Sequence, residues 1–112
     1  MKLSAKDAVI PPEKLSRYIL SLTHPDGRTK AQYLARLGYS EVDGPRLEAD
    51  LRVQHLSREA LPGKPSPYGR KYEILGPLTG PSGASAWVRT VWIVRTGESR
   101  PRLVTLVPEG KP

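Results

Sequence analysis

The chain has 112 residues, of which 38% are hydrophobic and 26% charged, and Lys plus Arg exceed Asp plus Glu by 18 to 11. This length and composition predict one globular domain over residues 1–112 with a modest core. Cysteine is absent and only two histidines occur. Disulfides, thiolate catalysis and Cys-based zinc sites are therefore excluded, and no metal or other cofactor is expected.

No apolar run approaches the length of a membrane span, and the first residues lack the apolar core of a signal peptide. We therefore expect a cytoplasmic protein without membrane contact. The net charge of +7 lies mostly in residues 57–112. Such an excess favours a polyanion or an acidic protein as partner, although an ordinary solvated surface explains it as well.

Helical patterns fill the first half of the chain, over residues 11–56. After Pro11 and Pro12, apolar residues recur at helical spacing through Leu22 and predict a first helix. A second helix is expected over about 28–37, ended by Gly38. A third is expected to follow Asp43 and to reach about residue 56.

The second half has strand patterns and predicts a sheet over residues 70–108. Residues 61–67 contain three prolines and are expected to form a loop, as is the turn-rich segment 76–83. Strands are predicted over 71–75, 85–95 and 102–107. The expected fold is therefore α+β, with two to three N-terminal helices packed on a three- to four-stranded antiparallel sheet.

One candidate site is the segment from His24 to Lys30, which joins the first two predicted helices. His24 is a natural general acid or base near neutral pH, and Lys30 and Arg28 are cations that suit a phosphate or carboxylate. The alternative is a capping loop whose histidine only hydrogen-bonds the backbone.

A second candidate lies on the predicted sheet. Arg89 and Arg102 could bind a phosphate, with Thr90 and Thr105 to orient it if the two threonines fall on the same face. Alternatively, these threonines are ordinary strand residues and the arginines are solvated. His55, at the end of a thin apolar helix face, is predicted to be structural rather than a ligand.

Further cations are candidates for binding nucleic acid by charge. Arg70 and Lys71 lie between Tyr68 and Tyr72, a weak pattern of basic and stacking residues. Arg28, Arg95 and Arg100 complete this group.

Several motifs together resemble those of a family of small bacterial domains of unknown function. They include His24-Pro25-Asp26-Gly27-Arg28 with Lys30-Ala31, Tyr68-Gly69-Arg70-Lys71-Tyr72, Arg89-Thr90-Val91-Trp92 and Pro101-Arg102-Leu103-Val104-Thr105. The resemblance covers nearly the whole chain. It implies a module of the kind found beside small partner genes and at the ends of larger toxin proteins.

The layout of helices followed by a curved antiparallel sheet is also similar to that of the barnase/EndoU/colicin/RelE-like ribonucleases, an analogy of fold alone. It implies a toxin-type, metal-independent ribonuclease with RNA as substrate and His24 as general acid or base. The implied partner is a small acidic, antitoxin-like protein that inhibits the ribonuclease. In this hypothesis Lys30, Arg89 and Arg102 bind phosphate and the two threonines orient it. A non-catalytic module that binds nucleic acid or an acidic protein, and a purely structural domain, remain the alternatives.

Overall fold

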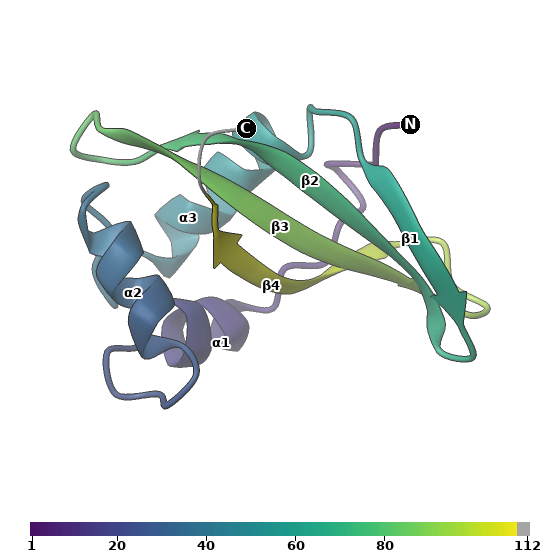
Figure 1. Cartoon of the computed structure of the whole chain (residues 1–112), viewed down its shortest axis with the longest axis horizontal. Coiled ribbons are helices and arrows are strands. Elements are labelled where there is room, and N and C mark those ends of the chain that lie inside the picture. Colours follow the sequence, from purple (N-terminus) through teal and green to yellow (C-terminus); the bar gives the residue numbers. More distant parts are fainter. Residues whose placement is uncertain (110–112) are drawn as a thin grey trace.

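A computed structural model describes residues 1–109 and confirms the α+β class (Figure 1). Helix α1 (Pro12–Lys14) continues into the π-helical segment η1 (Leu15–Ile19), and α2 (Arg28–Ala35) follows after a loop. Helix α3 (Gly44–Asp50) continues into a second π-helical segment, η2 (Leu51–His55). The first predicted helix thus ends before Leu22, whose side chain is half exposed.

Four antiparallel strands follow in the spatial order β1-β2-β3-β4. They are β1 (Leu61–Ser66), β2 (Gly69–Thr79), β3 (Ser85–Arg95) and β4 (Pro101–Pro108). The predicted strand over 85–95 is confirmed, and β2 extends beyond its predicted range at both ends.

The prediction of a loop over residues 61–67 is wrong, because Leu61–Ser66 pairs with β2 as a strand. All six of its residues are exposed, so its sequence has no buried apolar side that would mark it as a strand. Its prolines are tolerated because an edge strand leaves part of its backbone unpaired, so a missing N–H need not break the ladder.

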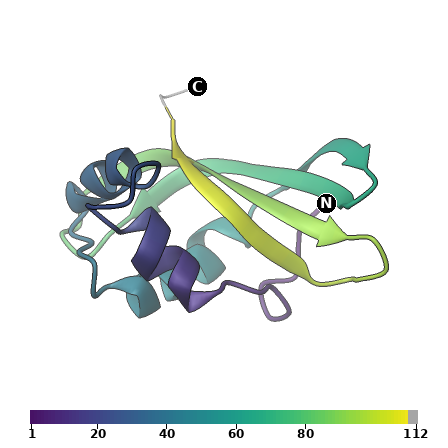
Figure 2. The same cartoon turned by 90° about the horizontal axis from the view of Figure 1, so that it is seen from below.

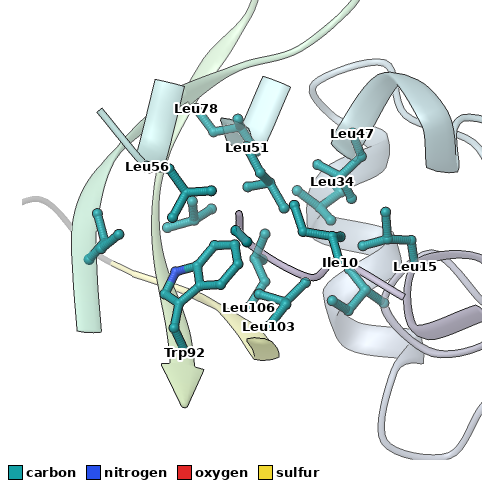
Figure 3. Packing of buried hydrophobic residues seen from close by; sticks show 14 of the residues in the cluster. Ile10, Leu15, Leu34, Leu47, Leu51, Leu56, Leu78, Trp92, Leu103 and Leu106 are labelled. Atoms are coloured by element: carbon teal, nitrogen blue, oxygen red, sulfur yellow. The ribbon is translucent and has the colours of Figure 1, made fainter. Parts of the chain in front are cut away.

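The helices cover one face of the sheet, called here the inner face, and the core lies between the two layers (Figure 2). Val88, Thr90 and Trp92 of β3 point into it and are fully buried. Val88 and Trp92 belong to one cluster with leucines from η1, α2, α3, η2 and β4 (Figure 3). The alternate residues of β3, including Arg89, lie on the opposite, outer face and are only half buried.

The register of β4 decides which of its residues lie beside the predicted site residues of β3. Thr90 pairs with Leu106, whereas Val91 pairs with Thr105, and an irregularity follows before Ile93 pairs with Arg102. Paired residues of an antiparallel sheet share a face. Thr105, Arg102 and Arg89 therefore belong to the outer face, and Thr90 to the inner one.

Candidate functional site

Polar side chains from four separate segments meet around Tyr18, in what we call the Tyr18 cluster: Tyr18, His24, Lys30 and Thr105. The Tyr18 hydroxyl lies 3.2 Å from Oγ1 of Thr105 on β4. The His24 ring stands edge-on to the Tyr18 ring, with centroids 5.0 Å apart, and Nζ of Lys30 on α2 lies 5.8 Å from the same centroid. All four residues are half buried, so the cluster is open to solvent.

The imidazole of His24 caps the loop that leads into α2. Its Nδ1 accepts hydrogen bonds from the backbone N–H groups of Asp26 (3.0 Å) and Gly27 (3.1 Å). An Nδ1 that accepts carries no proton, so the neutral ring bears its proton on Nε2. The capping role considered for His24 is thus present, and the ring presents an Nε2–H donor while that cap is intact.

Close backbone packing fixes this loop against η1. A Cβ at Gly27 would lie 1.8 Å from the carbonyl oxygen of Tyr18, which no side chain can accommodate. Glycine therefore lets the loop approach η1 closely enough for His24 to contact the Tyr18 ring. Lys30 follows one turn later on α2, where its ammonium group takes part in a cation–π contact with that ring.

The outer face of the sheet holds the two predicted phosphate-binding arginines, each in ion pairs. Arg89 contacts Glu73 at 3.3 Å and Glu109 at 2.5 Å, and Arg102 contacts Glu98 at 3.4 Å. These pairs are partly exposed, so the carboxylates are weakly held partners that an anionic ligand can displace. Thr105, which is part of the Tyr18 cluster, lies on the same face.

Thr90 lies apart from the other candidates, in a buried network with His55. Trp92 Nε1–H donates to Thr90 Oγ1 (2.9 Å), and Thr90 Oγ1 lies 2.9 Å from Nδ1 of His55. Nε2 of His55 lies 3.2 Å from the carbonyl oxygen of Gly76. Donors and acceptors match if the Thr90 hydroxyl donates to Nδ1 and His55 carries its proton on Nε2.

Desolvation lowers the pKa of His55 to about 4, because the buried ring loses the water that would stabilise its charged form. Thr90 is fully buried and its hydroxyl is already used by two neighbours. Thr90 therefore does not adjoin Thr105, and it is not part of the Tyr18 cluster.

The predicted nucleic-acid-binding cations are all exposed but lie in different places. Arg28 begins α2, close to the Tyr18 cluster. Arg70, Lys71 and Arg95 lie near the turns at the far end of the sheet, with Arg100 at the start of β4, where its Nε donates to the carbonyl oxygen of Asp7 (2.9 Å). The structure thus separates Arg28, at the start of α2, from the other four, at the hairpin end of the sheet.

Sequence reasoning missed Tyr18, which it assigned to the apolar face of the first helix. Its hydroxyl was the available signal, since a tyrosine at the margin of an apolar face often has a polar partner. Within residues 1–109 no group of three or more His, Cys, Asp or Glu side chains is placed to hold a metal ion. None of the helices in that range has the length and apolar character needed to cross a membrane.

The family model of a domain of unknown function, DUF6883, matches residues 2–110. The chain belongs to this family. The predicted resemblance to a domain family of unknown function is thereby confirmed. No curated protein matches the chain.

Among solved structures, the fold is similar to a chain of a complex described as a contact-dependent growth inhibition toxin and immunity protein complex from Klebsiella pneumoniae 342. The two chains share 21% identity with a TM-score of 0.68, over 91% of this chain and all of the other. The TM-score over nearly the whole of both chains shows a common fold.

Proposed function

We propose that this domain is a toxin-type, metal-independent ribonuclease whose phosphate site is the Tyr18 cluster. The observation that carries the proposal is the convergence of His24, Lys30 and Thr105 around Tyr18. Each of these three residues suits phosphate chemistry by its type and sequence context, and they come together in a solvent-accessible place from three different segments.

The cluster offers groups that suit a phosphodiester during cleavage. In the proposed reaction the 2′ oxygen of a ribose bonds to phosphorus, the bond from phosphorus to the 5′ oxygen breaks, and the 2′ proton ends on the 5′ oxygen by way of solvent. The products are a 2′,3′-cyclic phosphate and a 5′ hydroxyl. The ammonium of Lys30 offsets the developing negative charge, and Nε2–H of His24 donates to a phosphate oxygen. Of the two hydroxyls that contact each other, Tyr18 and Thr105, one donates to the other, which leaves one O–H for the phosphate.

The outer face extends this site. Arg89 and Arg102 share that face with Thr105, and a phosphate can replace the exposed carboxylates that now pair with them. In the proposal they hold phosphates that flank the scissile one. Arg28, exposed at the start of α2, adds a further cation near the cluster.

The fold neighbour comes from a complex of a toxin with an immunity protein, and the charge of this chain favours the toxin role within such a pair. A net charge of +7 suits a protein that binds the phosphates of RNA, rather than an acidic protein that would take the place of RNA in such a complex. We accordingly propose cytoplasmic RNA as the target and a small acidic, immunity-type protein as the partner that covers the basic surface.

The capping role of His24 favours a second candidate function, a binding module without catalysis. While Nδ1 accepts two backbone hydrogen bonds, the ring cannot offer Nε2 as a base. The same cations would then hold RNA or an acidic protein without cleaving it.

Cleavage of total RNA in EDTA by the wild type, His24→Asn and His24→Ala separates these functions. An Asn side chain can accept the same two backbone hydrogen bonds but has no imidazole, whereas Ala removes both. The ribonuclease proposal predicts cleavage by the wild type and at least a tenfold slower rate for His24→Asn at unchanged folding. No cleavage by the wild type would favour the binding module, and a fully active His24→Asn would limit His24 to its capping role.

A further inference from the structure

The end of the sheet farthest from α2 combines exposed cations with an exposed aromatic ring. We call this region the hairpin tip and define it by Tyr68, Lys71 and Arg95. The turns of β1–β2 and β3–β4 lie side by side there, away from the helices (Figures 1 and 2), and the backbone N–H of Thr96 donates to the carbonyl oxygen of Tyr68 (3.0 Å). Tyr68 is 79% exposed.

The backbone that carries Tyr68 is held firmly, although its ring is free of the core. Ser66 Oγ accepts from the N–H of Tyr68 (3.2 Å) and donates to the carbonyl oxygen of Gly69 (3.1 Å). Gly69 has φ of +145°, and a Cβ there would lie 2.2 Å from the carbonyl oxygen of Val94. A rigid turn thus presents a large ring to solvent, which lowers the conformational cost of stacking a ligand on it.

The charge of the hairpin tip is not neutralised locally. Among residues 1–109, neither Lys71 nor Arg95 has an ion-pair partner, and the carboxylate of Glu98 in the next turn is paired with Arg102. Arg95 pairs with Gly69 and Lys71 pairs with Ile93, so the two cations are diagonal neighbours on the outer face, beside the turn that holds Tyr68. Two cations beside an exposed ring suit a ligand with negative charges and flat apolar groups in alternation, which is the chemistry of a single-stranded nucleic acid.

The hairpin tip is also in line with the proposed site. Thr105 pairs with Val91, and Arg102 pairs with Ile93 two residues further along β3. Arg95 follows two residues later on the same face, about 13 Å from the level of Thr105 at the usual strand rise. Cations therefore lead along the outer face from the Tyr18 cluster to the tip.

From this arrangement we infer that the hairpin tip is a subsite for single-stranded RNA, in which a base stacks on Tyr68, and Lys71 and Arg95 bind the adjoining phosphates. The inference rests on the proposed function for the identity of the ligand and names the contacts that hold the substrate beyond the scissile phosphate. The tip binds, and it takes no part in the chemical step.

The test is fluorescence anisotropy with a labelled single-stranded 2′-O-methyl RNA of roughly 12 nucleotides, which fits the length of typical single-strand sites and cannot undergo 2′ attack. Tyr68→Ala is expected to weaken binding about tenfold, whereas Tyr68→Phe keeps the ring and stays near the wild type. Arg95→Gln is expected to lower the slope of log affinity against log salt by about 0.7. Arg36→Gln, an exposed arginine at the end of α2 with the same charge change, is the matched control.

Binding of Tyr68→Ala and Arg95→Gln equal to that of Arg36→Gln would overturn the inference, and so would a wild type with no affinity for the probe. If the true ligand of the tip is an acidic protein, one of these two results is expected. Cleavage of natural RNA is measured on the same variants. If the tip variants bind the probe more weakly and the wild type cleaves no RNA, the RNA subsite at the tip is supported and the ribonuclease proposal is rejected. If the wild type cleaves RNA and the tip variants bind the probe normally, the ribonuclease proposal is supported and the subsite is rejected.

Discussion

Replacing Thr90 by Val tests whether this threonine serves the core or the site. The substitution keeps the shape of the side chain but removes the hydroxyl that accepts from Trp92 Nε1–H and contacts Nδ1 of His55, both at 2.9 Å. All three side chains are fully buried, so water cannot replace the lost partners. A buried polar group without a partner costs about 1–3 kcal/mol. Two such groups predict a loss of about 2–6 kcal/mol in the free energy of unfolding, a large part of the stability of a domain this size.

Urea unfolding followed by tryptophan fluorescence measures this loss, with Thr90→Ser as the control that keeps the hydroxyl. The midpoint should fall for Val much more than for Ser, at an unchanged m-value. RNA cleavage per folded molecule should stay the same in both variants. A loss below about 0.5 kcal/mol for Thr90→Val would refute the network as described, and loss of cleavage at full folding would return Thr90 to the catalytic group.

Three further outcomes are expected from the structure. Burial lowers the pKa of His55 to about 4 from its usual 6.5, so the unfolded chain takes up a proton before the folded chain as the pH falls. The stability present above pH 6.5 should therefore be lost towards pH 4, by up to about 3 kcal/mol. Urea titrations at several pH values should show this dependence, and His55→Gln should flatten it. Gly27→Ala should lower the thermal midpoint and RNA cleavage together, because its Cβ would collide with the Tyr18 carbonyl; a stable, active variant would contradict the packing of this loop. Arg89→Gln should change the free energy of unfolding by less than about 1 kcal/mol, since its ion pairs are partly exposed, yet it should slow cleavage; normal cleavage would remove Arg89 from the proposed site.

Local sequence patterns predict the layers of this fold well and its edges poorly. Ser85–Arg95 has the alternation and β-branched residues of a central strand, and both of its neighbours pair with it as expected. Pro77 is predicted to lie in a turn, but it lies in β2. The β1 pairing ends at Glu73, so that stretch of β2 has a free side and does not need the N–H that proline lacks.

The candidate site shows a similar division between local and long-range information. His24 and Lys30 are close in the chain, and their types and spacing indicate an anion site directly. The position of Thr105 relative to Thr90 depends on the register of β4, and a shift by one residue moves a side chain to the other face. Tyr18 joins the site through its contact with Thr105, 87 positions away in the chain, which no local pattern encodes.

The most direct test of the proposed function is the cleavage of a synthetic RNA in EDTA by the wild type, Lys30→Gln and Lys64→Gln. Lys64 is an exposed lysine of β1, so its substitution makes the same charge change away from the Tyr18 cluster. The proposal predicts products ending in 2′,3′-cyclic phosphate from the wild type and Lys64→Gln, and a rate at least tenfold lower for Lys30→Gln. Equal rates for the two lysine variants, or an RNA left intact by the wild type, would contradict a ribonuclease site at this cluster.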